Sequence, residues 1–263
     1  MSLKHSYSLI LPPPPSKNLA LQRFSGFNNK KNAFTLAEIL ISLMILGIIA
    51  SMTIPALITK YQKKQTCVKL ERIYSTLSQA VKFAEANNGP MSSWEVGNAK
   101  NANDCKKFLE KYVTPYLRIS KKPTTSSEGK WNNTVYYMNG NVYTYPSSHV
   151  RFYLNDGSSM TAYIHSSNNT SKRVIIDIDI NGDNKPNKFG RDIFSLSYPV
   201  VLTDYPHLAG KLMPAGFNID FPLTRDELLS ERTENRCNKN KNGGHCFGLI
   251  ILDGWKIADD YPW

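Results

Sequence analysis

The sequence predicts an α+β protein in which one long N-terminal helix is followed by an antiparallel sheet. Two observations predict this class. Apolar residues dominate positions 39–58 and then recur every three or four residues up to position 84, which is the pattern of a helix. Beyond residue 130, β-branched and aromatic residues flank short turns rich in Asn and Gly, which is typical of hairpins. A helix followed by hairpins favours a sheet that packs on the helix.

The first 33 residues predict a basic leader that lies outside the fold. The net charge of the chain is +11, and the leader contains no Asp or Glu. The run Pro12–Pro15 lacks backbone donors and has a fixed φ, so we expect an extended leader. Basic residues that flank a membrane span stay in the cytoplasm, so the rest of the chain is expected across the membrane. The leader's basic residues are Lys4, Lys17, Arg23, Lys30 and Lys31.

The mature part would keep 27 Lys and Arg residues against 21 Asp and Glu. This modest excess is compatible with binding to nucleic acid or to an anionic surface, but a solvated surface also explains it.

Residues 34–58 predict a membrane-spanning helix. The run Ile39–Ile58 has 20 residues, which make about 30 Å of helix, enough to cross a bilayer. An ordinary signal anchor has a similar length. A secretory signal peptide has a shorter apolar core and a small-x-small cleavage site, and no persuasive site follows this run.

Residues 59–88 predict an amphipathic continuation of the same helix. Polar residues such as Lys69 and Arg72 alternate with the apolar stripe, and Asn87-Asn88-Gly89-Pro90 is a helix stop. Pro55 is expected to bend the helix. The apolar stripe comprises Leu70, Ile73, Tyr74, Leu77, Ala80, Val81 and Ala84.

Residues 89–263 predict a globular head built from hairpins. Asn139-Gly140-Asn141 lies within the run 134–145, and Asn155-Asp156-Gly157 separates strands expected at 150–154 and 160–164. A further strand is expected at 174–180. A last hairpin is expected between Leu249–Leu252 and Trp255–Ala258, across Asp253-Gly254.

Glu38 is the lone carboxylate near the start of the apolar helix. An ionisable side chain costs roughly 2.5 kcal/mol or more at the centre of a bilayer, and less near its edge, so it is rarely found there without a partner. Cutting the chain after Ala33 would create a cationic amine on Phe34, which a neighbouring copy could bring to Glu38.

The run Lys30-Lys31-Asn32-Ala33-Phe34-Thr35-Leu36-Ala37-Glu38 resembles the cleavage and methylation signal of type IV prepilins and type II secretion pseudopilins. The resemblance implies a pilin-like fold and cleavage by a membrane-embedded prepilin peptidase between Ala33 and Phe34. It also implies N-methylation of Phe34, and roles in assembly for Glu38 and Pro55. The family usually has Gly before the cut, where this chain has the small residue Ala33.

By the same resemblance, the chain would be a structural subunit of a type IV pilus-like or type II secretion pseudopilus filament. Its partners would be copies of itself and related pilins, the peptidase, an inner-membrane assembly platform and membrane lipid. Its head would be extracytoplasmic. The alternatives are a DNA-uptake pseudopilin and a permanently anchored extracytoplasmic binding protein.

An acidic turn in the head predicts a candidate calcium site. Alternate positions on a strand share a face, and carboxylate and amide oxygens are the ligands that Ca²⁺ prefers. By resemblance, major pseudopilins carry calcium in a C-terminal loop, although the ligands named here follow from this sequence alone. Asx side chains that cap a turn with Gly182 and Gly190 explain the block equally well. The candidate ligands are Asp177, Asp179, Asn181, Asp183 and Asp192.

Four cysteines predict disulfides in an oxidising compartment. Cys237 and Cys246 bracket a polar loop that a disulfide would close, and Cys67 with Cys105 is the second candidate pair. A zinc site made of Cys237, His245 and Cys246 is an alternative that lacks an evident fourth ligand. No nucleophile elbow, metalloprotease helix or phosphate loop occurs, so the sequence favours a protein without enzymatic activity.

Overall fold

The computed structural model describes residues 34–129, 131, 134–168, 171–201, 208, 210–216 and 223–263, so the predicted leader and Ala33 lie outside it. The chain divides into two units, Met1–Ser51 and Met52–Trp263, and helix α1 (Leu36–Asn88) begins in the first and ends in the second. The other helices are η1 (Met91–Ser93), α2 (Ala102–Tyr112), η2 (Thr114–Tyr116), α3 (Arg225–Leu229) and α4 (Cys246–Leu252). The strands are β1 (Ile119–Thr125), β2 (Val135–Tyr136), β3 (Val142–Tyr143), β4 (Val150–Leu154), β5 (Ser159–Asn168), β6 (Ser171–Asp179), β7 (Ile193–Val201) and β8 (Met213–Pro214).

Helix α1 confirms the predicted long helix. It has 53 residues, and Pro55 lies inside it without ending it. It ends at Asn88, where Gly89 has a φ of +79°. A residue without a Cβ adopts this left-handed conformation at little cost, which explains the stop at the predicted place.

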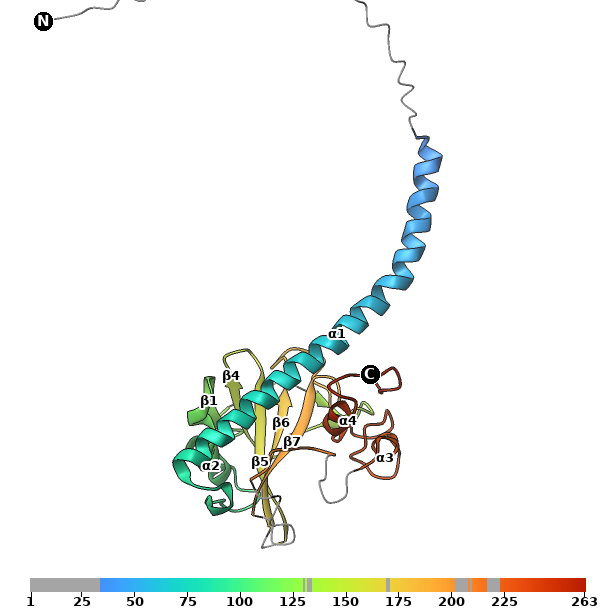
Figure 1. Ribbon diagram of the computed structural model, residues 1–263. Coiled ribbons are helices and arrows are strands. Elements are labelled where there is room, and N and C mark those ends of the chain that lie inside the picture. Colours follow the sequence, from blue (N-terminus) through green and yellow to red (C-terminus); the bar gives the residue numbers. More distant parts are fainter. Residues whose placement is uncertain are drawn as a thin grey trace, which may run out of the picture. The chain divides into compact units, whose positions relative to one another are not determined.

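The second half of α1 packs on the large sheet through the predicted stripe (Figure 1). Leu70, Leu77 and Ala84 are fully buried, whereas Val68 and Phe83 on the same helix are exposed. This periodic burial is the expected behaviour of an amphipathic helix.

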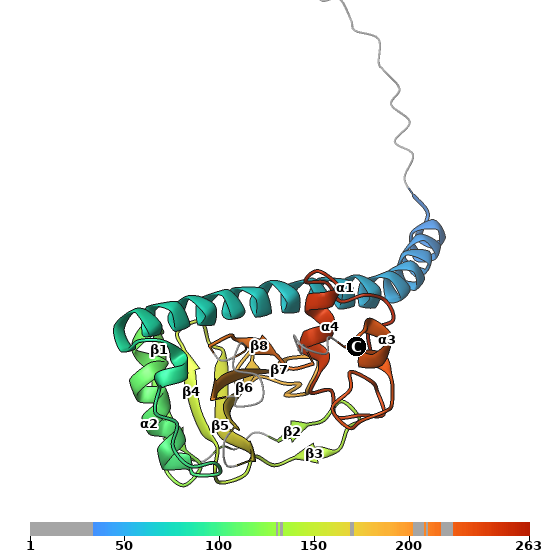
Figure 2. The same ribbon diagram turned by 60° about the horizontal axis from the view of Figure 1, so that its bottom comes forward.

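The large sheet has six strands in the order β1-β4-β5-β6-β7-β8, and every neighbouring pair is antiparallel. In β6, Ile176 pairs with Ala162 of β5 and with Leu196 of β7, and these side chains form the inner face, which is buried with α1. The alternate residues of the same strands form the outer face. Figure 2 shows α1 along the inner face and the β2–β3 hairpin on the opposite side of the sheet.

Three predicted groups of strands are confirmed. The turn at Asn155-Asp156-Gly157 joins β4 to β5, and β6 covers most of the predicted run 174–180. The run 134–145 forms the β2–β3 hairpin, which makes a separate two-stranded sheet.

The predicted last hairpin is wrong. Residues 249–252 belong to helix α4, whose residues Phe247, Leu249 and Ile250 are fully buried. A short apolar run has no clear period when it is buried on all sides, so it fits a core strand and a core helix equally well. Asp253 and Gly254 end the helix instead of turning a hairpin.

Helix α2 and strands β1, β7 and β8 had no counterpart among the predicted elements, although two of them carry a signal. Asn101 caps α2 because its side chain accepts hydrogen bonds from the backbone N–H groups of Asn103 and Asp104. Phe194, Leu196 and Tyr198 alternate along β7 and face the core.

His149 is a buried histidine, 3% exposed, that stacks with Tyr163 and Tyr145 at ring distances of 4.3 and 5.4 Å. Its Nε2 atom has no hydrogen-bond partner within the described part of the chain. Burial, together with the nearby charge of Arg151, lowers the pKa of His149 to about 4. The folded protein therefore holds this imidazole neutral where the unfolded chain would protonate it.

We predict that His149 makes the head less stable in acid. Between pH 6.5 and about 4 only the unfolded chain binds the proton, so the free energy of unfolding falls as the pH falls through this window, by about 1–3 kcal/mol. His149→Phe should remove that loss, as measured by chemical unfolding at a series of pH values, whereas substitution of the exposed Ser147 by Ala should keep it. The comparison with wild type is needed because Asp179, whose pKa is raised to about 8, acts in the opposite direction. Equal pH dependence in wild type and His149→Phe would contradict the prediction.

Candidate functional site

The N-terminal end of α1 is organised by Thr35 and Glu38. The Glu38 N–H donates to the Thr35 hydroxyl at 3.2 Å. In return, Oε2 of Glu38 accepts from the Thr35 N–H and from its hydroxyl, both at 2.8 Å. This reciprocal pair is a capping box, and it satisfies backbone donors that the first helical turn would leave free. Glu38 thus has a local role that was not predicted above, although Thr35 followed three residues later by Glu38, before an apolar run, is the sequence signature of a capping box.

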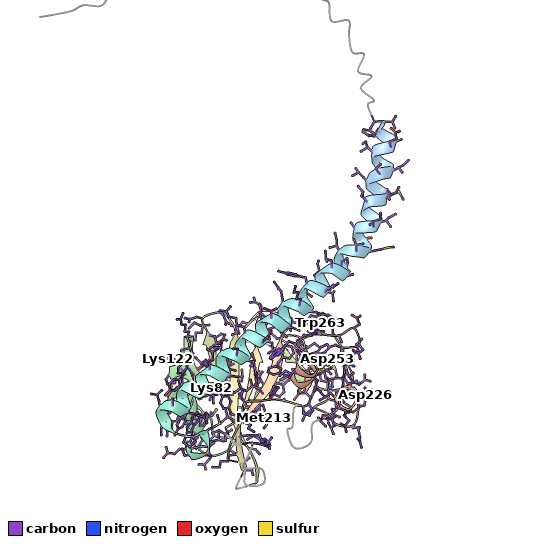
Figure 3. The ribbon with its side chains drawn as sticks, viewed as in Figure 1. Lys82, Lys122, Met213, Asp226, Asp253 and Trp263 are labelled. Carbon is purple, nitrogen blue, oxygen red and sulfur yellow. A yellow bond between two sulfur atoms is a disulfide. The ribbon has the colours of Figure 1, made fainter. Side chains whose placement is uncertain are left out.

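The apolar first half of α1 has no cover within the described part of the chain. Ile41, Leu46 and Ile54 are 60%, 61% and 52% exposed, and Phe34 before the helix is 78% exposed. Figure 3 shows side chains projecting from this part of the ribbon into open space. By length and composition this is the one helix of the described residues that could cross a membrane. Such a continuous apolar surface calls for lipid or for other helices.

The predicted metal ligands fall into two places. Asp192 accepts hydrogen bonds from the N–H groups of Asn187 and Lys188 at 2.8 and 2.6 Å. Oδ1 of Asp179 accepts from the N–H of Asn181 at 3.2 Å. These bonds close the acidic turn by the Asx capping that the sequence also allowed.

Burial is the main cause of the raised pKa values in this turn, and repulsion between carboxylates adds to it at Asp179. Burial and the charge of Asp192 raise the pKa of Asp179 to about 8, and the charge of Asp183 adds to the effect. Burial also raises the pKa of Asp192, which its backbone hydrogen bonds partly offset. A divalent cation would relieve the repulsion. Among the described residues, however, no three His, Cys, Asp or Glu side chains form a ready metal site, so a cation would also need amide or backbone oxygens.

Asp177 lies apart from that turn and faces the outer side of the sheet. It is 5% exposed and accepts a 2.5 Å hydrogen bond from the Ser195 hydroxyl on β7. Tyr145 donates a second hydrogen bond, yet burial still raises the pKa of Asp177 to about 6.

The disulfide between Cys237 and Cys246 is confirmed, and it links the loop before α4 to the start of that helix. Both sulfur atoms are therefore taken, which excludes the alternative zinc site with His245. The second predicted pair is wrong: Cys67 on α1 and Cys105 on α2 are free, buried thiols. Each packs in the apolar core, and burial raises their pKa to about 11 and about 12.

A cavity of about 630 Å³ on the outer face of the sheet was not predicted. Tyr163, Arg173 and Asp177 belong to its floor, and Tyr137 and Asn242 to its walls. The sequence did contain a signal for the floor, because residues 173, 175 and 177 alternate along one strand and must lie on the same face of the sheet. The walls come from segments far apart in the sequence, and their meeting depends on the tertiary fold.

Comparison with known proteins gives two family matches. Residues 28–54 match the prokaryotic N-terminal methylation motif, which confirms the prepilin-type signal inferred from Lys30–Glu38. No curated protein and no solved structure matches the chain. Residues 56–263 match the second family along nearly the whole head. Behind its prepilin-type signal, the chain therefore belongs to the family of unknown function DUF6613.

Proposed function

We propose that this chain is a structural subunit of a type IV pilus-like or type II secretion pseudopilus filament. The observation that carries the proposal is the position of the methylation motif, which leads directly into an exposed apolar helix. In this proposal the precursor inserts with its basic leader in the cytoplasm and its head outside the inner membrane. Prepilin peptidase then removes residues 1–33 and methylates Phe34. The chain is a substrate of that peptidase and not itself an enzyme.

Assembly would then place α1 in a helical bundle with copies of itself or related pilins, with the help of an inner-membrane platform. The exposed first half of α1 would exchange lipid for neighbouring helices. The Phe34 amine of one subunit would meet Glu38 of the next. This pair would mainly fix the register of the subunits. A register in which the two groups do not meet leaves a buried charge without a partner, which costs about 3–5 kcal/mol.

A second candidate function is a permanently anchored extracytoplasmic binding protein, which the cavity on the outer face of the sheet favours. A DNA-uptake pseudopilin is a variant of the filament proposal. It rests only on the modest excess of positive charge in the mature part, and it requires binding to DNA that weakens as salt rises.

Cleavage of the leader is the first test. In a cell with an active prepilin peptidase, mass spectrometry of the membrane-extracted protein should find a chain that begins with methylated Phe34. Ala33→Gly should be cleaved at least as well, whereas Ala33→Leu should keep the leader because a large side chain replaces the small one before the cut. A wild-type protein that retains residues 1–33 would point to the anchored binding protein instead.

Substitutions of Glu38 test the proposed ion pair separately from the capping box. Glu38→Ala should insert into the membrane but assemble poorly, since it leaves the neighbouring amine buried without a partner at a cost of about 3–5 kcal/mol per subunit. Glu38→Gln keeps an acceptor for Thr35 but lacks the charge, so it should fail in the same way. Electron microscopy of filaments and membrane fractionation measure the two steps. Normal filaments in either variant would contradict the ion pair, and Ser42→Ala serves as a control on the same helical turn.

We further propose that calcium draws Asp179, Asn181, Asp183 and Asp192 of the acidic turn together as ligands, since these side chains do not form a ready metal site in the structure, with Asp177 outside the site. Calcium should raise the melting temperature relative to chelator, because a ligand held by the folded state alone stabilises it by about 2.7 kcal/mol at a hundred times its Kd. Asp192→Asn should abolish the difference between calcium and chelator, whereas Asp156→Asn, in the β4–β5 turn, should keep it. Equal melting of the wild-type protein in calcium and in chelator would leave Asx capping as the explanation of this sequence block.

A further inference from the structure

The cavity on the outer face of the sheet lies on the side away from α1. Its floor is formed by β5, β6 and β7, and the β2–β3 hairpin covers one side (Figure 2). Leu208, Met213 and Leu223 also line the cavity, and Met213 is labelled in Figure 3. The loop closed by the disulfide contributes Asn242 and His245. A volume of about 630 Å³ falls within the range of small-molecule sites.

Several polar side chains reach this cavity without a hydrogen-bond partner among the described residues. Within the described part of the chain, no hydrogen bond is made by the hydroxyl groups of Tyr137, Tyr143 and Tyr163 or by the side chains of His165 and Arg173. Polar groups that gather in a cavity and are not bonded to one another are available to water or to a ligand.

The charges of the cavity lie at two separate places. Asp177 and Arg173 belong to the same strand and the same face, four residues apart, which places their Cα atoms about 13 Å from each other. Ile175 lies between them, and Tyr163 pairs with Ile175 on the neighbouring strand. The floor therefore runs from an anion, across an apolar and aromatic middle, to a cation.

The surroundings of Asp177 suit an ammonium group. Tyr137, Tyr143 and Phe189 form an aromatic wall, with ring centroids 5.0 to 5.7 Å apart. The charge of Asp177 acts on the first two of these rings. A carboxylate together with aromatic faces attracts a cation. Ser195 and Tyr145 use only part of the acceptor capacity of the carboxylate.

The other end suits a carboxylate. Arg173 pairs across the strands with His165, and neither side chain has an acidic partner within the described residues. A guanidinium group binds a carboxylate through two parallel hydrogen bonds. A ligand with phosphate alone would fit this end but would be repelled by Asp177, and an uncharged sugar would leave the charge of Arg173 without an acidic partner.

We propose that this cavity binds a short peptide as a zwitterion, with its ammonium group at Asp177 and its carboxylate at Arg173. Three residues in extended conformation span about 10 Å, which is close to the distance of about 13 Å between the Cα atoms of Asp177 and Arg173. The apolar residues Leu208, Met213 and Leu223 would contact the middle side chain of the peptide. The proposal does not rest on filament formation, because it concerns the head of the unassembled protein.

The test is isothermal titration of the full-length protein in detergent with the tripeptide Ala-Leu-Ala. The tripeptide should bind, and acetylation of its N-terminus or amidation of its C-terminus should each weaken binding about tenfold or more, since each change removes one charge-assisted hydrogen-bonded contact. Maltotriose should not bind. Three results would overturn the proposal: no binding of Ala-Leu-Ala, binding of the capped peptides as tight as that of the free peptide, or binding of maltotriose alone.

Two variants assign the ends of the peptide. In Arg173→Gln, Ala-Leu-Ala and its amide should bind equally weakly, because the contact that distinguishes them is gone. In Asp177→Asn, the free and acetylated peptides should bind equally. Arg118→Gln is the matched control, because Arg118 is exposed and lies outside the cavity lining, and it should keep the wild-type ratios. In Arg173→Gln the acetylated peptide should still bind more weakly than the free peptide, and in Asp177→Asn the amide should still bind more weakly than the free peptide. A general loss of stability would remove these remaining differences as well, so it cannot produce the expected pattern. If Arg173→Gln still distinguishes the acid from the amide, the assignment of the carboxylate is wrong.

Discussion

The contact between the second half of α1 and the inner face of the sheet is the one on which the rest of the head depends. The inner face presents Ile176, Leu196 and Tyr198, which are almost entirely removed from solvent. Such a surface must be covered by another apolar face, since polar groups buried there would lack hydrogen-bond partners. Leu70 and Leu77 supply that cover. Because the same helix continues from the apolar N-terminal segment, any subunit contact made there is attached to a rigid secondary element of the head.

The outer face of the sheet is covered differently, and this difference creates the cavity. Small or polar residues such as Ser195 and Ser197 occupy the floor there. The cover consists of the β2–β3 hairpin, whose strands have two residues each, and of the loop that the disulfide closes. Such a cover does not fill the space as a helix would. Gly190 shows how closely the cover packs at one point, because a Cβ atom there would lie 2.2 Å from Cε of Met138 and 2.8 Å from Sγ of Cys246. The disulfide therefore holds part of the wall beside a backbone position that only glycine fits.

Much of this architecture is predictable because it depends on local periodicity. The stripe of α1, the Gly89 stop and the β4–β5 turn are each determined by residues close in sequence. Residues 249–252 were misjudged because complete burial removes the polar positions that reveal a period. The Cys67–Cys105 pair failed because spacing says nothing about whether two helices bring their thiols together. The cavity could not be predicted either, since Tyr137, Arg173 and Asn242 meet only in the folded head.

The capping box explains how Glu38 can remain in apolar surroundings before and after the proposed cut. Both bonds that its carboxylate accepts come from Thr35, at 2.8 Å each. Cleavage between Ala33 and Phe34 leaves the peptide bond from Phe34 to Thr35 intact, so the Thr35 N–H donor survives processing. Both bonds end on Oε2, and Oε1 has no hydrogen-bond partner among the described residues. One oxygen is thus held in place locally while the other stays open to a cation. A carboxylate fixed by two donors is already oriented when a neighbouring amine arrives, which lowers the entropy lost on pairing. In the proposed filament, Thr35 would in this sense contribute to the assembly contact without touching the neighbouring subunit.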